Sequence, residues 1–138
     1  MKPWMLLAFA LALILAACNA GRDETVIFSC VAEADATPGS ARRVDFRYED
    51  RFLFVRNDAG GADNVCSQTG TRLCEISLTG DSLTLRQEID TPYCGWRQMA
   101  RTTLDIDRRT GVFQFMQEGC DPGTDLRLTG LCEMSRPE

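Results

Sequence analysis

Apolar and polar side chains alternate along most of the chain, and this alternation constrains the fold more than any other feature of the sequence. Val44, Phe46 and Tyr48, for example, are separated by charged residues. Because successive side chains of a strand point to opposite faces, this period predicts strands with one buried and one exposed face. We therefore expect about eight strands, at residues 26–32, 43–49, 52–55, 74–78, 83–89, 103–107, 113–115 and 126–132.

Short and long connections between these strands follow one another in turn. The links at residues 49–50, 79–81 and 107–111 are short enough for tight hairpin turns, and Gly111 suits a left-handed turn position. Longer links rich in Gly, Pro, Asn and Asp occupy residues 33–41, 57–71, 90–97 and 118–124. An up-and-down arrangement then gathers all long loops at one end. The predicted fold class is all-β: a small antiparallel meander forming a closed or nearly closed barrel, with a β-sandwich or an open, strongly bent sheet as the alternative.

The N-terminal segment has the pattern of an export signal. Lys2 precedes 14 consecutive apolar residues, Trp4 to Ala17, which is shorter than the roughly 20 residues that a membrane-spanning helix needs. The run ends in Leu15-Ala16-Ala17-Cys18, which resembles the lipobox of bacterial lipoproteins. This resemblance implies cleavage before Cys18 and a lipid on its thiol. We expect a signal peptide at 1–17, an anchor linker at 18–24 and a single β domain at 25–138.

The same resemblance implies a location. The protein is expected in the cell envelope of a Gram-negative bacterium, facing the periplasm and attached through the lipid on Cys18. Asn19, where an aspartate would favour retention at the inner membrane, favours the outer membrane.

Of the seven cysteines, six remain once Cys18 is assigned to a lipid. An even number in a small exported domain predicts disulfides. A zinc site is disfavoured because the chain has no histidine and no CxxC pair. Six cysteines allow fifteen pairings. The strand and loop order favours Cys94 with Cys120, Cys66 with Cys74, and Cys30 with Cys132, but it does not exclude the others.

Composition excludes several functional classes. The lack of histidine rules out His-based triads and general bases. Loss of the signal removes Lys2 and leaves 14 arginines against 20 acidic residues, a net charge of −6, which disfavours binding to nucleic acid. Asp105 and Asp107 could form a carboxylate pair for acid–base catalysis, but residues 107–111 also have the pattern of a plain hairpin turn. We expect no enzymatic activity, no cofactor and no metal.

The candidate binding residues lie in the long loops. These loops contain one arginine, Arg97, against seven acids: Glu33, Asp35, Asp58, Asp63, Asp90, Glu118 and Asp121. The acids predict an acidic loop end. Tyr93 and Trp96 flank Cys94 and Gly95 and are of the type that anchors protein interfaces, although Trp96 could instead cap the open end of the core. Oxygen atoms of residues 58–64 could bind Ca²⁺, but the spacing differs from that of an EF-hand and favours a solvated loop.

These features predict a lipid-anchored, non-enzymatic binding or structural protein of the envelope, whose acidic loops contact a basic protein or another envelope component. A lipid anchor on a small disulfide-bonded β domain is similar to the membrane-bound lysozyme inhibitors of Gram-negative bacteria. That likeness implies, as one alternative, inhibition of a cell-wall hydrolase. The Ser/Gly/Lys/Tyr loop motif of those inhibitors has no counterpart here. A lipocalin-like carrier of small ligands is the other alternative.

Overall fold

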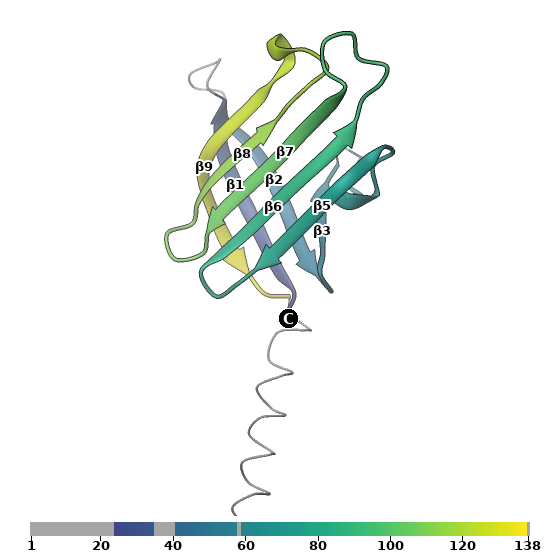
Figure 1. Ribbon diagram of the computed structural model, residues 1–138. Helices are drawn as coiled ribbons and strands as arrows, with labels where there is room; N and C mark the ends of the chain where they lie inside the picture. Colours follow the sequence, from purple (N-terminus) through teal and green to yellow (C-terminus); the bar gives the residue numbers. More distant parts are fainter. Residues whose placement is uncertain (1–23, 35–40, 58, 138) are drawn as a thin grey trace, which may run out of the picture.

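The computed structural model describes residues 24–34, 41–57 and 59–137, and this part of the chain forms one antiparallel β-sheet (Figure 1). Two short 3₁₀ turns, η1 (Val65–Ser67) and η2 (Pro122–Thr124), interrupt the strands. The strands are β1 (Val26–Ala34), β2 (Ala41–Glu49), β3 (Phe52–Arg56), β4 (Ala62–Asn64), β5 (Thr71–Leu78), β6 (Ser82–Asp90), β7 (Met99–Asp107), β8 (Val112–Gln117) and β9 (Leu126–Ser135).

The strands are arranged in the order β4-β3-β2-β1-β9-β8-β7-β6-β5, so the first long strand lies in the middle of the sheet. Here β1 pairs with both β2 and β9. The sheet curls on itself as a half-barrel, which confirms the predicted all-β class and the meander. Each of the eight predicted strands is present, and β4 is an additional strand inside the predicted 57–71 loop.

The half-barrel is not fully closed, because its edge strands, β4 and β5, do not form a ladder with each other. β3 pairs with the three residues of β4, and the chain then turns through η1 before it becomes β5. The Asn64 side chain starts this turn by accepting a hydrogen bond from the Cys66 N–H at 3.0 Å. The Cys66–Cys74 disulfide ties η1 to β5. The seam between the two sheet edges is therefore bridged by a turn and a disulfide rather than by strand pairing.

The two ends of the half-barrel differ as the connection lengths predicted. One end, which we call the base, carries the hairpin turns at residues 50–51, 79–81 and 107–111, together with the start of β1 and the end of β9 (Figure 1). The other end, the rim, carries the connections 57–70, 91–98 and 118–125. The connection 35–40 lies outside the described residues. Gly111 has φ +78° in the turn from β7 to β8, the left-handed conformation that glycine adopts without strain.

Apolar side chains fill the inner surface of the half-barrel toward the base. In β7 the burial alternates strictly, with Leu104 and Ile106 buried and Asp105 exposed between them. The largest fully buried apolar side chains come from five different strands: Phe28, Leu53, Leu83, Leu104, Ile106 and Phe113. This is the buried face that the period-two pattern predicted.

Three disulfides hold the sheet and its loops, and their pairing is the one that the sequence favoured. Cys30 and Cys132 lie directly opposite each other on β1 and β9, and the Cys94–Cys120 bridge joins two rim loops. A disulfide removes more chain entropy from the unfolded state when it closes a longer loop. Cys30–Cys132 spans 102 residues and Cys66–Cys74 only 8. By loop length alone these bridges contribute about 4.7 and about 2.6 kcal/mol to the free energy of unfolding.

Candidate functional site

Two rim loops form the candidate site. Residues 91–98 connect β6 to β7, and residues 118–125 connect β8 to β9. Both loops stand at the top of the molecule as drawn in Figure 1, and the Cys94–Cys120 disulfide joins them. We call these two segments the loop pair. Cys94 is buried, with 7% of its surface exposed, and Cys120 is exposed, so the disulfide reaches from the interior of the first loop to the surface of the second.

Hydrogen bonds at its neck hold the first loop closed. The backbone N–H of Thr91 donates to Gln98 O at 2.8 Å, and the Thr91 hydroxyl donates to Arg97 O at 2.7 Å. The Cys94 N–H donates to Thr91 O at 3.0 Å. Thr91 is 5% exposed, and its buried hydroxyl is thus satisfied. A threonine at the end of a strand gave no sequence signal that it would close a loop.

Asp121 organises the second loop. Its Oδ1 accepts a hydrogen bond from the Gly123 N–H at 2.9 Å at the start of η2, and its backbone O accepts from the Thr124 hydroxyl at 2.8 Å. Gly119 packs against this turn so closely that a Cβ there would lie 2.0 Å from Thr124 Oγ1. Asp121, predicted as a binding residue, thus uses one carboxylate oxygen to shape the loop.

An ion pair joins the two loops a second time. Arg97 Nη1 lies 2.5 Å from Asp125 Oδ1 and Nη2 lies 3.1 Å from Oδ2, a bidentate arrangement. The Gly119 N–H also donates to Asp125 Oδ1, at 3.2 Å. The hydrogen bonds from Arg97 are the main cause that lowers the pKa of Asp125, and the Gly119 N–H lowers it further. The same pairing raises the pKa of Arg97. The sequence singled out Arg97 as the loop cation but not Asp125 as its partner.

Tyr93 and Trp96 project from this restrained loop into solvent. Their exposed fractions are 79% and 82%, the largest among the exposed apolar and aromatic side chains in the described part of the chain. The alternative in which Trp96 caps the open end of the core is therefore wrong. The disulfide at Cys94 restrains the loop, as that alternative also predicted. The restrained loop nevertheless holds both aromatic side chains in solvent.

The remaining predicted binding residues do not join these aromatics in one cluster. Asp90 is exposed at the end of β6, where its backbone N–H donates to Gly70 O at 2.8 Å. Asp63 lies on β4, and both of its carboxylate oxygens accept from Asn57 Nδ2 at 3.2 Å. Asp58 lies outside the described residues.

The charge separation between rim and base is smaller than the loop acids predicted. Arg42, Arg72 and Arg127 stand near the first residues of β2, β5 and β9, which places them at the rim beside the loop acids. An arginine near the first residue of a strand lies at the end of the half-barrel where that strand begins. The sequence pattern placed these arginines on strands but did not show that they lie at the rim. The exposed aromatics distinguish the loop pair more clearly than its charge does.

Asp107, one of the two carboxylates considered for acid–base work, has a structural role. Asp107 Oδ1 accepts hydrogen bonds from the Arg109 N–H at 2.8 Å and the Thr110 N–H at 3.3 Å. These bonds, led by that from Arg109, lower its pKa. Asp107 thus opens the β7–β8 turn, as the hairpin interpretation of residues 107–111 predicted.

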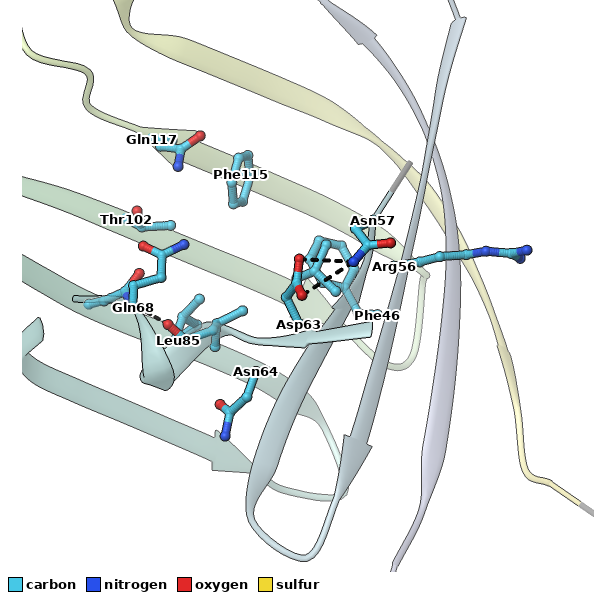
Figure 2. A pocket seen from close by; sticks show the side chains of 13 residues that line it. Phe46, Arg56, Asn57, Asp63, Asn64, Gln68, Leu85, Thr102, Phe115 and Gln117 are labelled. Carbon is cyan, nitrogen blue, oxygen red and sulfur yellow. Dashed lines mark hydrogen bonds between the residues drawn. The ribbon is translucent and has the colours of Figure 1, made fainter. Parts of the chain in front are cut away.

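A cavity of about 350 Å³ opens on the inner face of the half-barrel near the rim (Figure 2). Phe46 and Phe115 form part of its wall, with their ring centroids 6.5 Å apart. Asp63 and Asn57 lie at its edge, so Asp63 belongs to this cavity rather than to the loop pair. The sequence offered a ligand cavity only through the lipocalin-like alternative, and it did not predict this position at the rim.

No family model, curated protein or solved structure matches this chain. In the described segments no group of three or more His, Cys, Asp or Glu side chains could hold a metal ion. None of the helical segments within those residues is long and apolar enough to cross a membrane.

The Arg97–Asp125 pair predicts how acid affects the loop pair. Because the folded-state pKa of Asp125 lies below its ordinary value of 3.8, its ionised form stabilises the fold above that pH, and this stabilisation is lost as the pH falls through the folded-state value. We expect Asp125→Asn to lower the free energy of unfolding at neutral pH and to lose less of it below pH 3.8 than the wild type does. Urea unfolding across this pH range measures both effects.

Asp105→Asn is the matched control for this measurement, because Asp105 is exposed on the outer face of β7. The control should keep the acid response of the wild type. An Asp125→Asn variant with the same acid response as the wild type would show that the pair does not stabilise the loops.

Proposed function

We propose that this protein is a lipid-anchored, non-enzymatic binding protein of the bacterial envelope that contacts a protein or another envelope component through the loop pair. The exposure of Tyr93 and Trp96 on a doubly tied loop carries this proposal. Exposed aromatic side chains are unfavourable in water and are enriched at the centres of interfaces. A loop that is already ordered loses little conformational entropy on binding.

The chemistry of the loop pair indicates the kind of partner. The Tyr93 hydroxyl and the Trp96 indole N–H can donate hydrogen bonds at the edge of a contact while the rings fill apolar pockets. Glu118 and Asp121 lie near enough to Arg97 of the same loop pair to raise its pKa, and Asp90 ends β6 just before the first loop. Together with a net charge of −6 after signal removal, these acids favour a partner with a neutral or basic surface around an apolar pocket.

The proposed anchor accounts for the direction in which the loop pair faces. Glu24 is held at the base, where its Oε1 lies 2.9 Å from Arg108 Nη2 and 3.2 Å from Arg136 Nη2. Five residues lie between it and Cys18, so the base stays within about 20 Å of the lipid. Strands of nine residues add about 30 Å between base and rim. The loop pair would then face away from the membrane and lie some 30–50 Å from it.

Three arginines of the base, Arg108, Arg109 and Arg136, add little to this attachment in our proposal, whereas Arg51, exposed in the β2–β3 turn, has no ion pair among the described residues. Arg108 and Arg136 share Glu24, and Arg109 Nε lies 3.8 Å from Asp107 and 4.0 Å from Asp81. Cations that already face carboxylates attract anionic headgroups weakly. We therefore assign the membrane attachment to the lipid on Cys18 and not to a basic surface.

Trp96→Ala tests the binding role of the loop pair. Because Trp96 is 82% exposed, the substitution should leave the unfolding temperature unchanged. It should weaken capture of the partner from an envelope extract roughly 30-fold, the typical effect of removing a dominant interface tryptophan. Capture on immobilised protein, quantified over a dilution series, measures the change.

Phe52→Ala is the matched control, since Phe52 is a 49% exposed aromatic on β3 at the base. It should retain full capture. If Trp96→Ala and Phe52→Ala captured the same proteins as strongly as the wild type, binding through the loop pair would be refuted.

Cys18→Ser tests the anchor separately. A serine cannot carry the thioether-linked lipid, so we expect loss of the lipid and release of any processed protein from the membrane fraction. Mass spectrometry of the N-terminal peptide and fractionation of cells measure the two effects. Retention of a processed Cys18→Ser protein on membranes would contradict lipid anchoring.

A further inference from the structure

Three polar side chains form a row on the inner face of the half-barrel. Nearer the base, the inner face of the same strands is apolar. Gln87 on β6 pairs with Thr102 on β7, and Thr102 pairs with Gln117 on β8. The row directly below, toward the base, is Leu85, Leu104 and Phe115. Three neighbouring strands thus change from apolar to polar at the same level. We call Gln87, Thr102 and Gln117 the polar row.

The polar row faces the cavity near the rim rather than a packed core. All three side chains line the 350 Å³ cavity. Gln87 is 2% exposed and Thr102 is 8% exposed. The Gln87 Nε2 donates to Val65 O at 2.5 Å and so holds η1 against the sheet. Gln117 is exposed. Among the described residues, neither the Thr102 hydroxyl nor the Gln117 amide hydrogen-bonds to another protein group, and no fully buried polar side-chain atom lacks a partner. Both polar groups are therefore accessible to solvent in the cavity, where a ligand can hydrogen-bond to them in place of water.

The opposite side of the cavity adds an apolar surface and more amides. Phe46 on β2 faces Phe115 on β8, and Asn57 and Asn64, the last residue of β4, also line the cavity (Figure 2). Aromatic rings can contact the apolar face of a flat ligand while the amides bond to its edge. The combination suits a molecule with one apolar face and several hydroxyl or amide groups.

Two charged side chains, Arg56 and Asp63, line the cavity in the described part of the chain. Arg56 is directed away from it in Figure 2, with 64% of its side chain exposed and Nη1 3.8 Å from Asp45. The Asp63 carboxylate accepts hydrogen bonds from the neutral Asn57 amide and so keeps its negative charge. A fatty acid would require a cation for its carboxylate, and its chain would leave the polar row without partners. The ligand is therefore polar and not an anion.

We propose that this cavity binds a neutral saccharide unit of one or two rings, held by the polar row and by contact with Phe46 and Phe115. Its volume of about 350 Å³ lies at the lower end of the range for small-ligand sites, which suits a ligand of this size. The proposal goes beyond the partner binding of the loop pair and does not depend on it, because the polar row and Tyr93 or Trp96 share no residue.

Titration with N-acetylglucosamine and its β-1,4-linked disaccharide tests this site. The ¹⁵N,¹³C-labelled, lipid-modified protein is placed in nanodiscs, and the side-chain amide signals of Gln87 and Gln117 and the Thr102 methyl signal are followed by NMR. We expect saturable shifts at these three residues with at least one of the two sugars. Thr102→Val and Gln117→Leu should each weaken binding about tenfold, the effect of one hydrogen bond.

Two variants on the outer face of the same strands are matched controls. Thr103→Val on β7 and Gln114→Leu on β8 make the same chemical changes on the other side of the sheet and should bind the sugars like the wild type. The Thr102 and Gln117 variants place apolar groups against an apolar wall, and their unfolding temperatures show that they fold.

The proposal is overturned if neither sugar produces saturable shifts at high millimolar concentration. It is equally overturned if the shifts occur at Tyr93 and Trp96 but not at the polar row, or if Thr102→Val and Gln117→Leu bind as tightly as the wild type. Loss of partner capture in Trp96→Ala leaves this titration unchanged, so the two proposals fail independently.

Discussion

The pairing of β1 with β9 determines where every functional element of this protein lies. Eight aligned residue pairs join the first strand to the last, and the Cys30–Cys132 disulfide locks that register at its middle. Gly130 lets the two strands approach, since a Cβ there would lie 2.0 Å from Val31 O. This junction curls the sheet, and it also brings both termini of the described domain to the base. The rim is thereby left free for the loop pair and the cavity.

The strands and disulfides could be predicted because their signals are local or follow from chain order. Alternation such as that of Leu83 and Leu85 with polar neighbours predicts a strand wherever it occurs. Cys30 and Cys132 belong to the first and last strands, so their pairing followed once those strands were expected to meet. The open seam could not be predicted in this way. It depends on Asn64 turning the chain into η1, a choice that composition in a loop does not reveal.

Two further features depend on contacts between residues far apart in the sequence and could not be predicted from it. Arg97 and Asp125 are 28 residues apart and meet only because two loops leave adjacent hairpins side by side. Gln87, Thr102 and Gln117 each resemble an ordinary strand residue, and only the register of three strands brings them together in one row. The loop end therefore contains two different surfaces. One is an outward-facing aromatic pair, and the other is an inward-facing polar row, and only the first had a signal in the sequence.

The account depends most on the claim that Tyr93 and Trp96 are exposed on a loop that is already rigid. Backbone ¹⁵N relaxation of residues 93–97 in the lipid-anchored protein tests this claim directly. We predict order parameters near those of the sheet, about 0.85, because the disulfide at Cys94 and the ion pair at Arg97 restrain both sides of Trp96. Order parameters below about 0.6 at Gly95 and Trp96 would describe a flexible loop and would contradict the account.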